Sequence, residues 1–153
     1  MSKKLKILLY TLGILIAMQF IGIDKTVPQL EGRLDFIEIE TPPKDIARLI
    51  KKACYDCHSY ETVFPSYSNY APISWVIGNH VQEGRKHLNF STWGNYKEVV
   101  RKDLLLKSYK QIGARLMPPF GYVKFHKEAK IQNDQLEKFY VWFKKQSQKY
   151  SKL

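Results

Sequence analysis

The first apolar segment of the chain is continuous rather than periodic. Residues 7–23 carry no charged side chain, and three lysines precede them, Lys3, Lys4 and Lys6. As a helix these residues would measure roughly 25 Å, slightly less than a hydrocarbon core of about 30 Å but long enough for a short span. The segment lacks the small residues of a signal-peptide cleavage site. We therefore expect residues 1–23 to form an uncleaved membrane helix with a cytoplasmic N-terminus.

The next part of the chain has no sustained hydrophobic period. Residues 24–43 alternate acidic residues with Pro28, Gly32 and the pair Pro42-Pro43. We expect a linker here, with one short strand at residues 36–39. The remaining residues, 44–153, are enough for one modest domain.

Helical periods dominate this domain. A helix is predicted to start at residues 41–45, and its apolar side chains follow at helical spacing: Ile46, Leu49, Ile50, Ala53 and Cys54. Similar patterns predict a helix over residues 96–109 and another from Asn133 onward. Residues 60–72 and 116–129 have no strong period and are expected to be loops. The pattern thus predicts an all-α domain of four or five helices.

Composition narrows the class of protein. An apolar share of 44% with three Trp, ten Tyr and eight Phe excludes intrinsic disorder. The two cysteines, Cys54 and Cys57, lie too close together in the sequence to stabilise a secreted domain by disulfide bonding. Their role is therefore expected to be chemical.

Cys54-Tyr55-Asp56-Cys57-His58 is a C-x-x-C-H motif, the attachment pattern of c-type haem. Two cysteines three residues apart on a helical turn can form thioethers with the two vinyl groups of one haem, while the adjacent imidazole reaches the iron. A structural zinc site would need further ligands, and a thioredoxin-like dithiol would need βαβ patterning. The helical period around the motif favours haem c, with its iron, over both alternatives.

Many separated positions share a family pattern with this motif. They are Thr62, Pro65, Tyr67, Pro72, Ser74-Trp75, Glu83-Gly84-Arg85, Leu88-Asn89-Phe90-Ser91 and Trp93. The string resembles the small bacterial haem-binding domain family, whose members are anchored or exported, and it covers residues 47–143. The resemblance implies haem binding with a cytochrome c-like arrangement. With the N-terminal segment, it leads us to expect a single-pass inner-membrane protein whose haem domain lies on the periplasmic side.

His58 is the expected proximal iron ligand, and the distal position can be filled by Met, by His or by neither. Met117 lies in a proline-containing loop before the last predicted helix, the order found in class I cytochromes c, which this layout resembles. Alternatively, Met117 is an ordinary side chain that fills a gap in the hydrophobic core. His80 is the second candidate, whereas His87 and His126 lie among lysines and are expected to face solvent.

Arg85 and Trp75 are candidates for binding the haem propionates. They lie near Lys86, Asn89 and Trp93 in the sequence, and c-type sites commonly use Arg, Trp N–H or Asn donors for this purpose. The alternative is a helix end with solvated charges and packed aromatic rings.

These features favour an electron-transfer cytochrome, in which His58 and Met117 saturate the iron. The chain carries a net charge of +11, and residues 24–153 keep 22 basic against 14 acidic residues, a net +8. This charge suits an acidic redox partner or anionic lipid heads. Export disfavours nucleic-acid binding in spite of the charge, because basic charge alone is not a recognition motif. The alternative is a haem-based sensor with a labile Met117, or a peroxidase-like enzyme using His80 or Glu83 as acid–base group. We favour the carrier over the enzyme.

Overall fold

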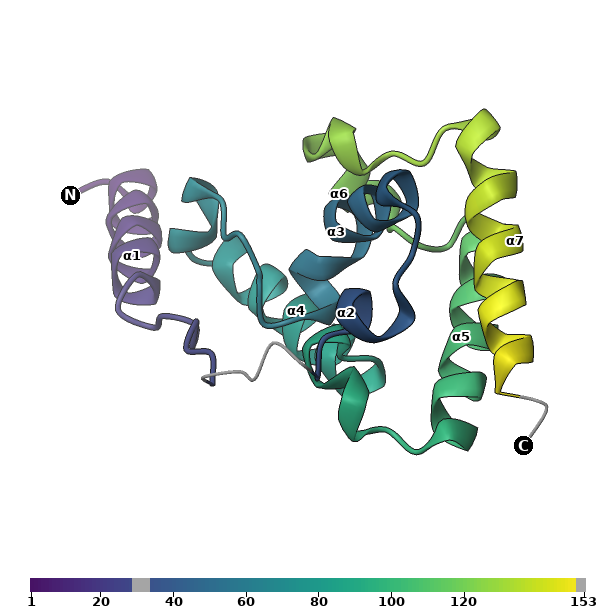
Figure 1. Ribbon diagram of the computed structural model, residues 1–153. Helices are drawn as coiled ribbons and strands as arrows, with labels where there is room; N and C mark the ends of the chain where they lie inside the picture. The colour runs from purple at the N-terminus through teal and green to yellow at the C-terminus, as the bar shows by residue number, and fades with distance from the viewer. Residues whose placement is uncertain (29–33, 151–153) are drawn as a thin grey trace.

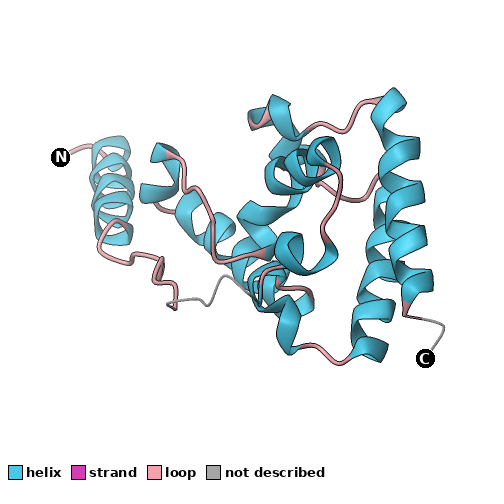
Figure 2. Cartoon of the chain, viewed as in Figure 1, coloured by secondary structure: helices cyan, strands magenta, loops and turns pink. Residues whose placement is uncertain are grey.

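The computed structural model describes residues 1–28 and 34–150, and within them it contains helices and no strand. The α-helices are α1 (Lys3–Met18), α2 (Phe36–Glu40), α3 (Lys44–His58), α4 (Ile73–His87), α5 (Glu98–Gly113), α6 (Phe120–Phe125) and α7 (Asn133–Lys149). Short 3-10 helices separate some of them: η2 (Ser66–Asn69), η3 (Phe90–Asn95) and η4 (Lys127–Ala129). Figure 2 shows this all-helical architecture, which confirms the all-α part of the prediction.

The helices form two groups around α3. Helices α5 and α7 run antiparallel along one side, and α4 packs on α3 toward the other side, with α1 beyond it (Figure 1). Helix α3 therefore lies in the middle of the molecule. Its C-terminal turn carries the C-x-x-C-H motif.

The core between these groups is aromatic. Phe36 is fully buried, and its ring lies 4.6 Å from that of Phe90 and 4.8 Å from that of Trp93, centroid to centroid. Phe143 of α7 and Tyr55 of α3 complete this cluster. Large rings each bury much apolar area, so one cluster joins α2, α3, η3 and α7.

The short strand expected at residues 36–39 is wrong, because these residues lie in α2. Asp35 caps the helix by accepting the Ile37 N–H at 2.8 Å. Phe36 and Glu40 are both buried, one turn apart, and Glu40 accepts the indole N–H of Trp93 at 2.8 Å. The two expected long loops also contain short helices: η2 in the first, and α6 with η4 in the second.

The predicted membrane helix is also wrong. Among the described residues no helix is both long and apolar enough to cross a membrane. Helix α1 ends at Met18, five residues before the apolar run does, because the following residues bond to the domain. The Gln19 side chain bonds to both the N–H and the carbonyl of Ala71, and Trp75 donates its indole N–H to the Ile21 carbonyl at 2.8 Å.

The expected location depended on this membrane helix. The prediction of a single-pass inner-membrane protein with a periplasmic haem domain is therefore also wrong. The division into segments 1–23, 24–43 and 44–153 stays a prediction.

Candidate haem-attachment site

The last turn of α3 holds the two cysteines. Ile46, Ile50 and Ala53 bury one face of the helix, and that face fixes the orientation of the turn that follows. Cys54 and Cys57 are partly buried and form no disulfide. Burial, followed by the neighbouring Cys57 charge, raises the pKa of the Cys54 thiol to about 12. Burial, followed by the charge of Asp56, raises that of Cys57 to about 11.

The His58 imidazole is held by two backbone carbonyl groups. Its Nδ1 lies 2.8 Å from the Gly84 oxygen and 3.0 Å from the Leu88 oxygen. Because carbonyl oxygens only accept hydrogen bonds, Nδ1 must carry the proton and act as the hydrogen-bond donor. This leaves Nε2 as the unprotonated nitrogen. Burial lowers the pKa of His58 and so favours this neutral form. A neutral imidazole oriented through one nitrogen is the form in which histidine binds metal through the other.

Gly84 allows α4 to come this close to α3. A methyl group at this position would overlap the carbonyl oxygen of Cys57 and lie 3.0 Å from its carbonyl carbon. The same residue provides the nearer acceptor of His58. Sequence reasoning missed Gly84 as a site residue, because no helix was predicted over this part of the chain and a glycine alone does not show which backbone it faces.

Arg85 reaches the segment directly after the motif. Its Nε donates to the Ser59 carbonyl at 2.8 Å, its Nη2 donates to Thr62 Oγ1 at 2.9 Å, and its guanidinium lies 4.9 Å from the centroid of the Tyr60 ring. The indole N–H of Trp75, by contrast, points to Ile21. The structure therefore brings Arg85, but not the Trp75 donor, to the motif, and the propionate roles of both stay predictions.

The other members of the expected propionate cluster have protein partners. Trp93 donates to the buried Glu40, Lys86 pairs with Glu83 at 2.6 Å, and Asn89 caps η3 by accepting the Ser91 N–H.

Met117 lies between α5 and α6, and 39% of its surface is exposed. The α6 helix that follows contacts the motif through a hydrogen bond, which the Tyr122 hydroxyl donates to Asp56 Oδ2 at 2.7 Å. His80 is exposed, and its Nδ1 bonds to the Val76 carbonyl of its own helix. His126 was expected to face solvent, but it is partly buried and its ring stacks on Tyr122 at 4.3 Å. The distal ligand itself stays a prediction.

Comparison with known protein families identifies the family of the chain. The model of the haem-binding domain family matches residues 13–145, most of the chain. The chain belongs to the haem-binding domain family. The predicted resemblance is thus confirmed, and haem is supported as the cofactor of this haem-binding domain. No curated protein and no solved structure matches the chain.

The donor set of the motif fits such a cofactor. Two free thiols lie one helical turn apart, and the adjacent imidazole has its Nε2 unprotonated. In the parts of the haem-binding domain that the structure describes, no group of three or more His, Cys, Asp and Glu side chains is arranged to hold a metal ion. A structural zinc ion takes four such ligands.

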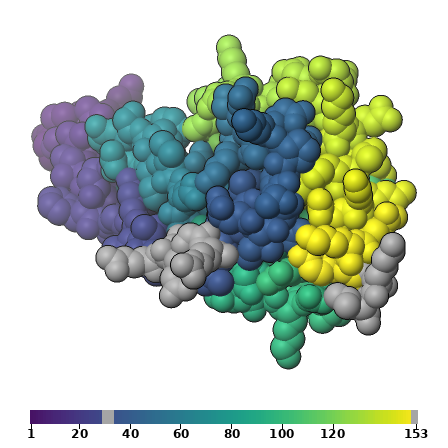
Figure 3. All heavy atoms as spheres, in the orientation of Figure 1, coloured from purple at the N-terminus to yellow at the C-terminus, as the bar shows by residue number. Residues whose placement is uncertain are grey.

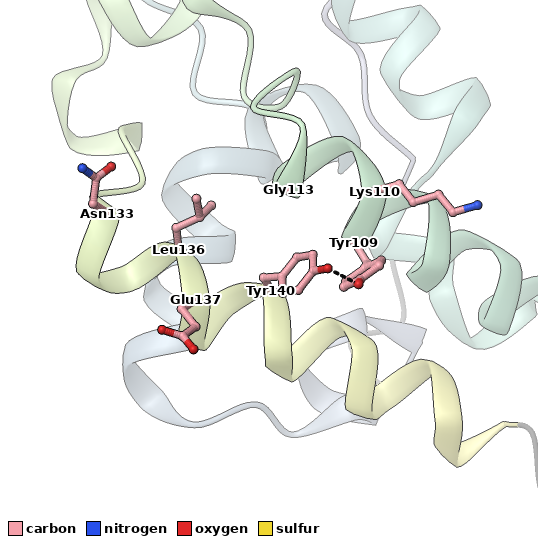
Figure 4. Close-up of a pocket in the computed structure, with 7 residues that line it drawn as sticks. All are labelled: Tyr109, Lys110, Gly113, Asn133, Leu136, Glu137 and Tyr140. Carbon is pink, nitrogen blue, oxygen red and sulfur yellow. Dashed lines mark hydrogen bonds between the residues drawn. The ribbon is translucent and has the colours of Figure 1, made fainter.

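A separate groove of about 500 Å³ lies between α5 and α7. Figure 4 shows its lining, in which Tyr109 and Tyr140 stack and share a hydrogen bond between their hydroxyl groups. Its seven lining residues include no cysteine, histidine or methionine. The groove is therefore distinct from the C-x-x-C-H motif.

Proposed function

We propose that this haem-binding domain attaches one haem c covalently, through thioethers to Cys54 and Cys57, and that His58 binds the iron through Nε2. The observation that carries the proposal is the pair of carbonyl acceptors, Gly84 and Leu88, on His58 Nδ1. They fix both the tautomer and the ring orientation one residue after Cys57. A hydrogen bond from the second nitrogen is the usual means of orienting and strengthening a histidine ligand.

Met117 is the proposed distal ligand, and electron transfer is the proposed activity. When bound, haem supplies one-electron exchange at its iron, and Met/His ligation raises the reduction potential. In this proposal the chain orients His58 through the Gly84 carbonyl of α4. The acid–base groups of the enzyme alternative are engaged elsewhere: Glu83 pairs with Lys86, and His80 bonds to its own helix.

The proposed partner is an acidic redox protein. A groove of about 440 Å³ lies between α3, η4 and the start of α7, where blue α3 atoms and yellow-green atoms meet in Figure 3. Its lining includes five basic residues, Arg48, Lys52, Lys127, Lys130 and Lys138, against the acidic Asp45, Glu128 and Asp134. Lys52 stands two residues before Cys54, so an acidic surface attracted to this groove would approach the helix that carries the motif.

Absorption spectra of the haem-loaded chain test the ligand assignment. Met117→Ala is compared with Met18→Ala, a methionine of α1 remote from the motif in the sequence. The proposal predicts a methionine-to-ferric-iron charge-transfer band that only Met117→Ala removes. An unchanged spectrum in Met117→Ala would exclude Met117 as ligand and leave His80 or an open distal site as the alternatives.

A further inference from the structure

Helix α6 packs against the hydrophobic core through the partly buried Tyr122. None of its side chains is fully buried, and Phe120 and Phe125 are 84% and 71% exposed. Helices without a buried apolar face open at low free-energy cost. The position of α6 therefore depends strongly on the polar and ring contacts that it makes.

Those contacts form one connected set, which we term the α6 latch: Tyr67, His126, Tyr122 and Asp56. Tyr122 donates to the Asp56 carboxylate at 2.7 Å, and the His126 ring stacks on Tyr122 with an interplanar angle of 12°. His126 Nε2 lies 3.0 Å from the Tyr67 hydroxyl oxygen. The α6 latch thus joins α6 to Asp56, the residue directly before Cys57, and to η2.

The environment of Tyr122 strengthens this attachment. Burial, followed by the hydrogen bond to Asp56, raises the pKa of Tyr122, so its hydroxyl stays protonated and can donate. Hydrogen bonds to a charged acceptor are stronger than those between neutral groups.

Met117 stands between this attachment and the end of α5. On the upstream side, its N–H and that of Leu116 donate to the Gln111 carbonyl at 3.3 and 2.9 Å. Both side chains are exposed, so neither anchors the loop by burial. The nearest downstream anchor is Tyr122, five residues later.

We infer that the α6 latch positions Met117 as the distal ligand, and that its opening frees the distal side of the iron for a small neutral ligand such as carbon monoxide. The inference rests on the proposed function. Tyr122 acts here as a positioning residue, through the loop that carries Met117. With the α6 latch closed, the domain acts as an electron carrier. With the α6 latch open, it acts as a haem protein that binds small ligands.

Carbon monoxide binding to the ferrous, haem-loaded full chain tests the inference. Tyr122→Phe removes the hydroxyl that bonds to Asp56 and lies 3.3 Å from the Lys52 carbonyl oxygen, and it keeps the ring that stacks on His126. We expect it to raise the carbon monoxide association rate about tenfold, the shift that loss of a bond to a charged acceptor produces in a local equilibrium. The matched control is Tyr70→Phe, since Tyr70 is 64% exposed and its hydroxyl has no partner among the described residues. It should bind carbon monoxide at the wild-type rate.

Amide hydrogen exchange gives a readout that does not depend on the iron. Tyr122→Phe should speed exchange across α6 and leave α5 unchanged. Tyr67→Phe, which removes the outer bond to His126, should produce a smaller increase in both measurements. Wild-type carbon monoxide rates and α6 exchange in both variants would overturn the inference.

Met117→Ala separates the failure of this inference from failure of the proposed function. It should bind carbon monoxide at least as fast as Tyr122→Phe. If Met117→Ala binds at the wild-type rate, both ideas are wrong. If Met117→Ala binds fast while Tyr122→Phe and Tyr67→Phe behave as wild type, only the latch is wrong.

Discussion

Gly84→Ala should be destabilising although alanine is the better helix former. A methyl group there would overlap the Cys57 carbonyl oxygen and lie 3.0 Å from its carbonyl carbon and 3.2 Å from its Cβ. Carbon atoms pack at about 3.5–4.0 Å, so α3 and α4 must separate by about 0.5–1 Å at this crossing. That separation would lengthen the 2.8 Å bond between His58 Nδ1 and the Gly84 oxygen.

The opposing free energies can be compared. Overpacking costs about 1–3 kcal/mol, and the weakened hydrogen bond about 1 kcal/mol. Replacing glycine by alanine inside a helix stabilises it by about 1 kcal/mol. The net expectation is a loss of about 1–3 kcal/mol in the free energy of unfolding, a large part of the total of about 5–15 kcal/mol for a domain.

Urea unfolding of the haem-loaded protein, with a measurement of its reduction potential, provides the assay. Gly13→Ala, inside α1, is the matched control. No atom lies within 4 Å of a methyl group built there, so we expect unchanged stability or a gain of up to about 1 kcal/mol. Only Gly84→Ala should also shift the reduction potential, because it moves the acceptor of His58. A Gly84→Ala protein as stable as the wild type, with the same potential, would refute this reasoning.

Three further predictions concern other parts of the domain. Arg85→Leu should lower the stability by about 1–3 kcal/mol through loss of the bonds to Ser59 and Thr62, and an unchanged reduction potential would reject the propionate role of Arg85. Burial raises the pKa of Asp35 above 3.8, so its contribution to stability is fully present below pH 3.8 and is lost as pH rises through the native pKa; urea unfolding of Asp35→Asn at several pH values should lack this dependence. Arg48→Glu with Lys52→Glu should slow electron transfer to an acidic redox protein at low salt more than Lys144→Glu with Lys145→Glu does, and equal effects would show that the groove is not the docking surface.

Local patterns predicted α3 and its motif well. The helical period of residues 46–54 and the C-x-x-C-H spacing both depend on residues close together in the chain, and α3 ends at His58 as the motif requires. Helix α7 likewise begins at Asn133, where its apolar period starts.

Long-range contacts account for what the sequence could not predict. The acceptors of His58 lie 26 and 30 residues away, and no local pattern identifies a backbone carbonyl as a partner. Helix α2 formed where a strand was expected, because Asp35 caps it and Trp93, 53 residues from Glu40, fixes that carboxylate. The apolar run was interpreted as one membrane helix, because the sequence does not reveal the long-range bonds between Gln19 and Ala71, which lie 52 residues apart.

The most direct test of the account is the mass of the denatured chain after production with a cytochrome c maturation system. Covalent attachment predicts that the wild-type polypeptide keeps one haem through denaturation and acid–butanone extraction, and that the Cys54→Ala, Cys57→Ala double variant loses it. A wild-type chain that gives up its haem on extraction and shows only the mass of the polypeptide would contradict the central claim.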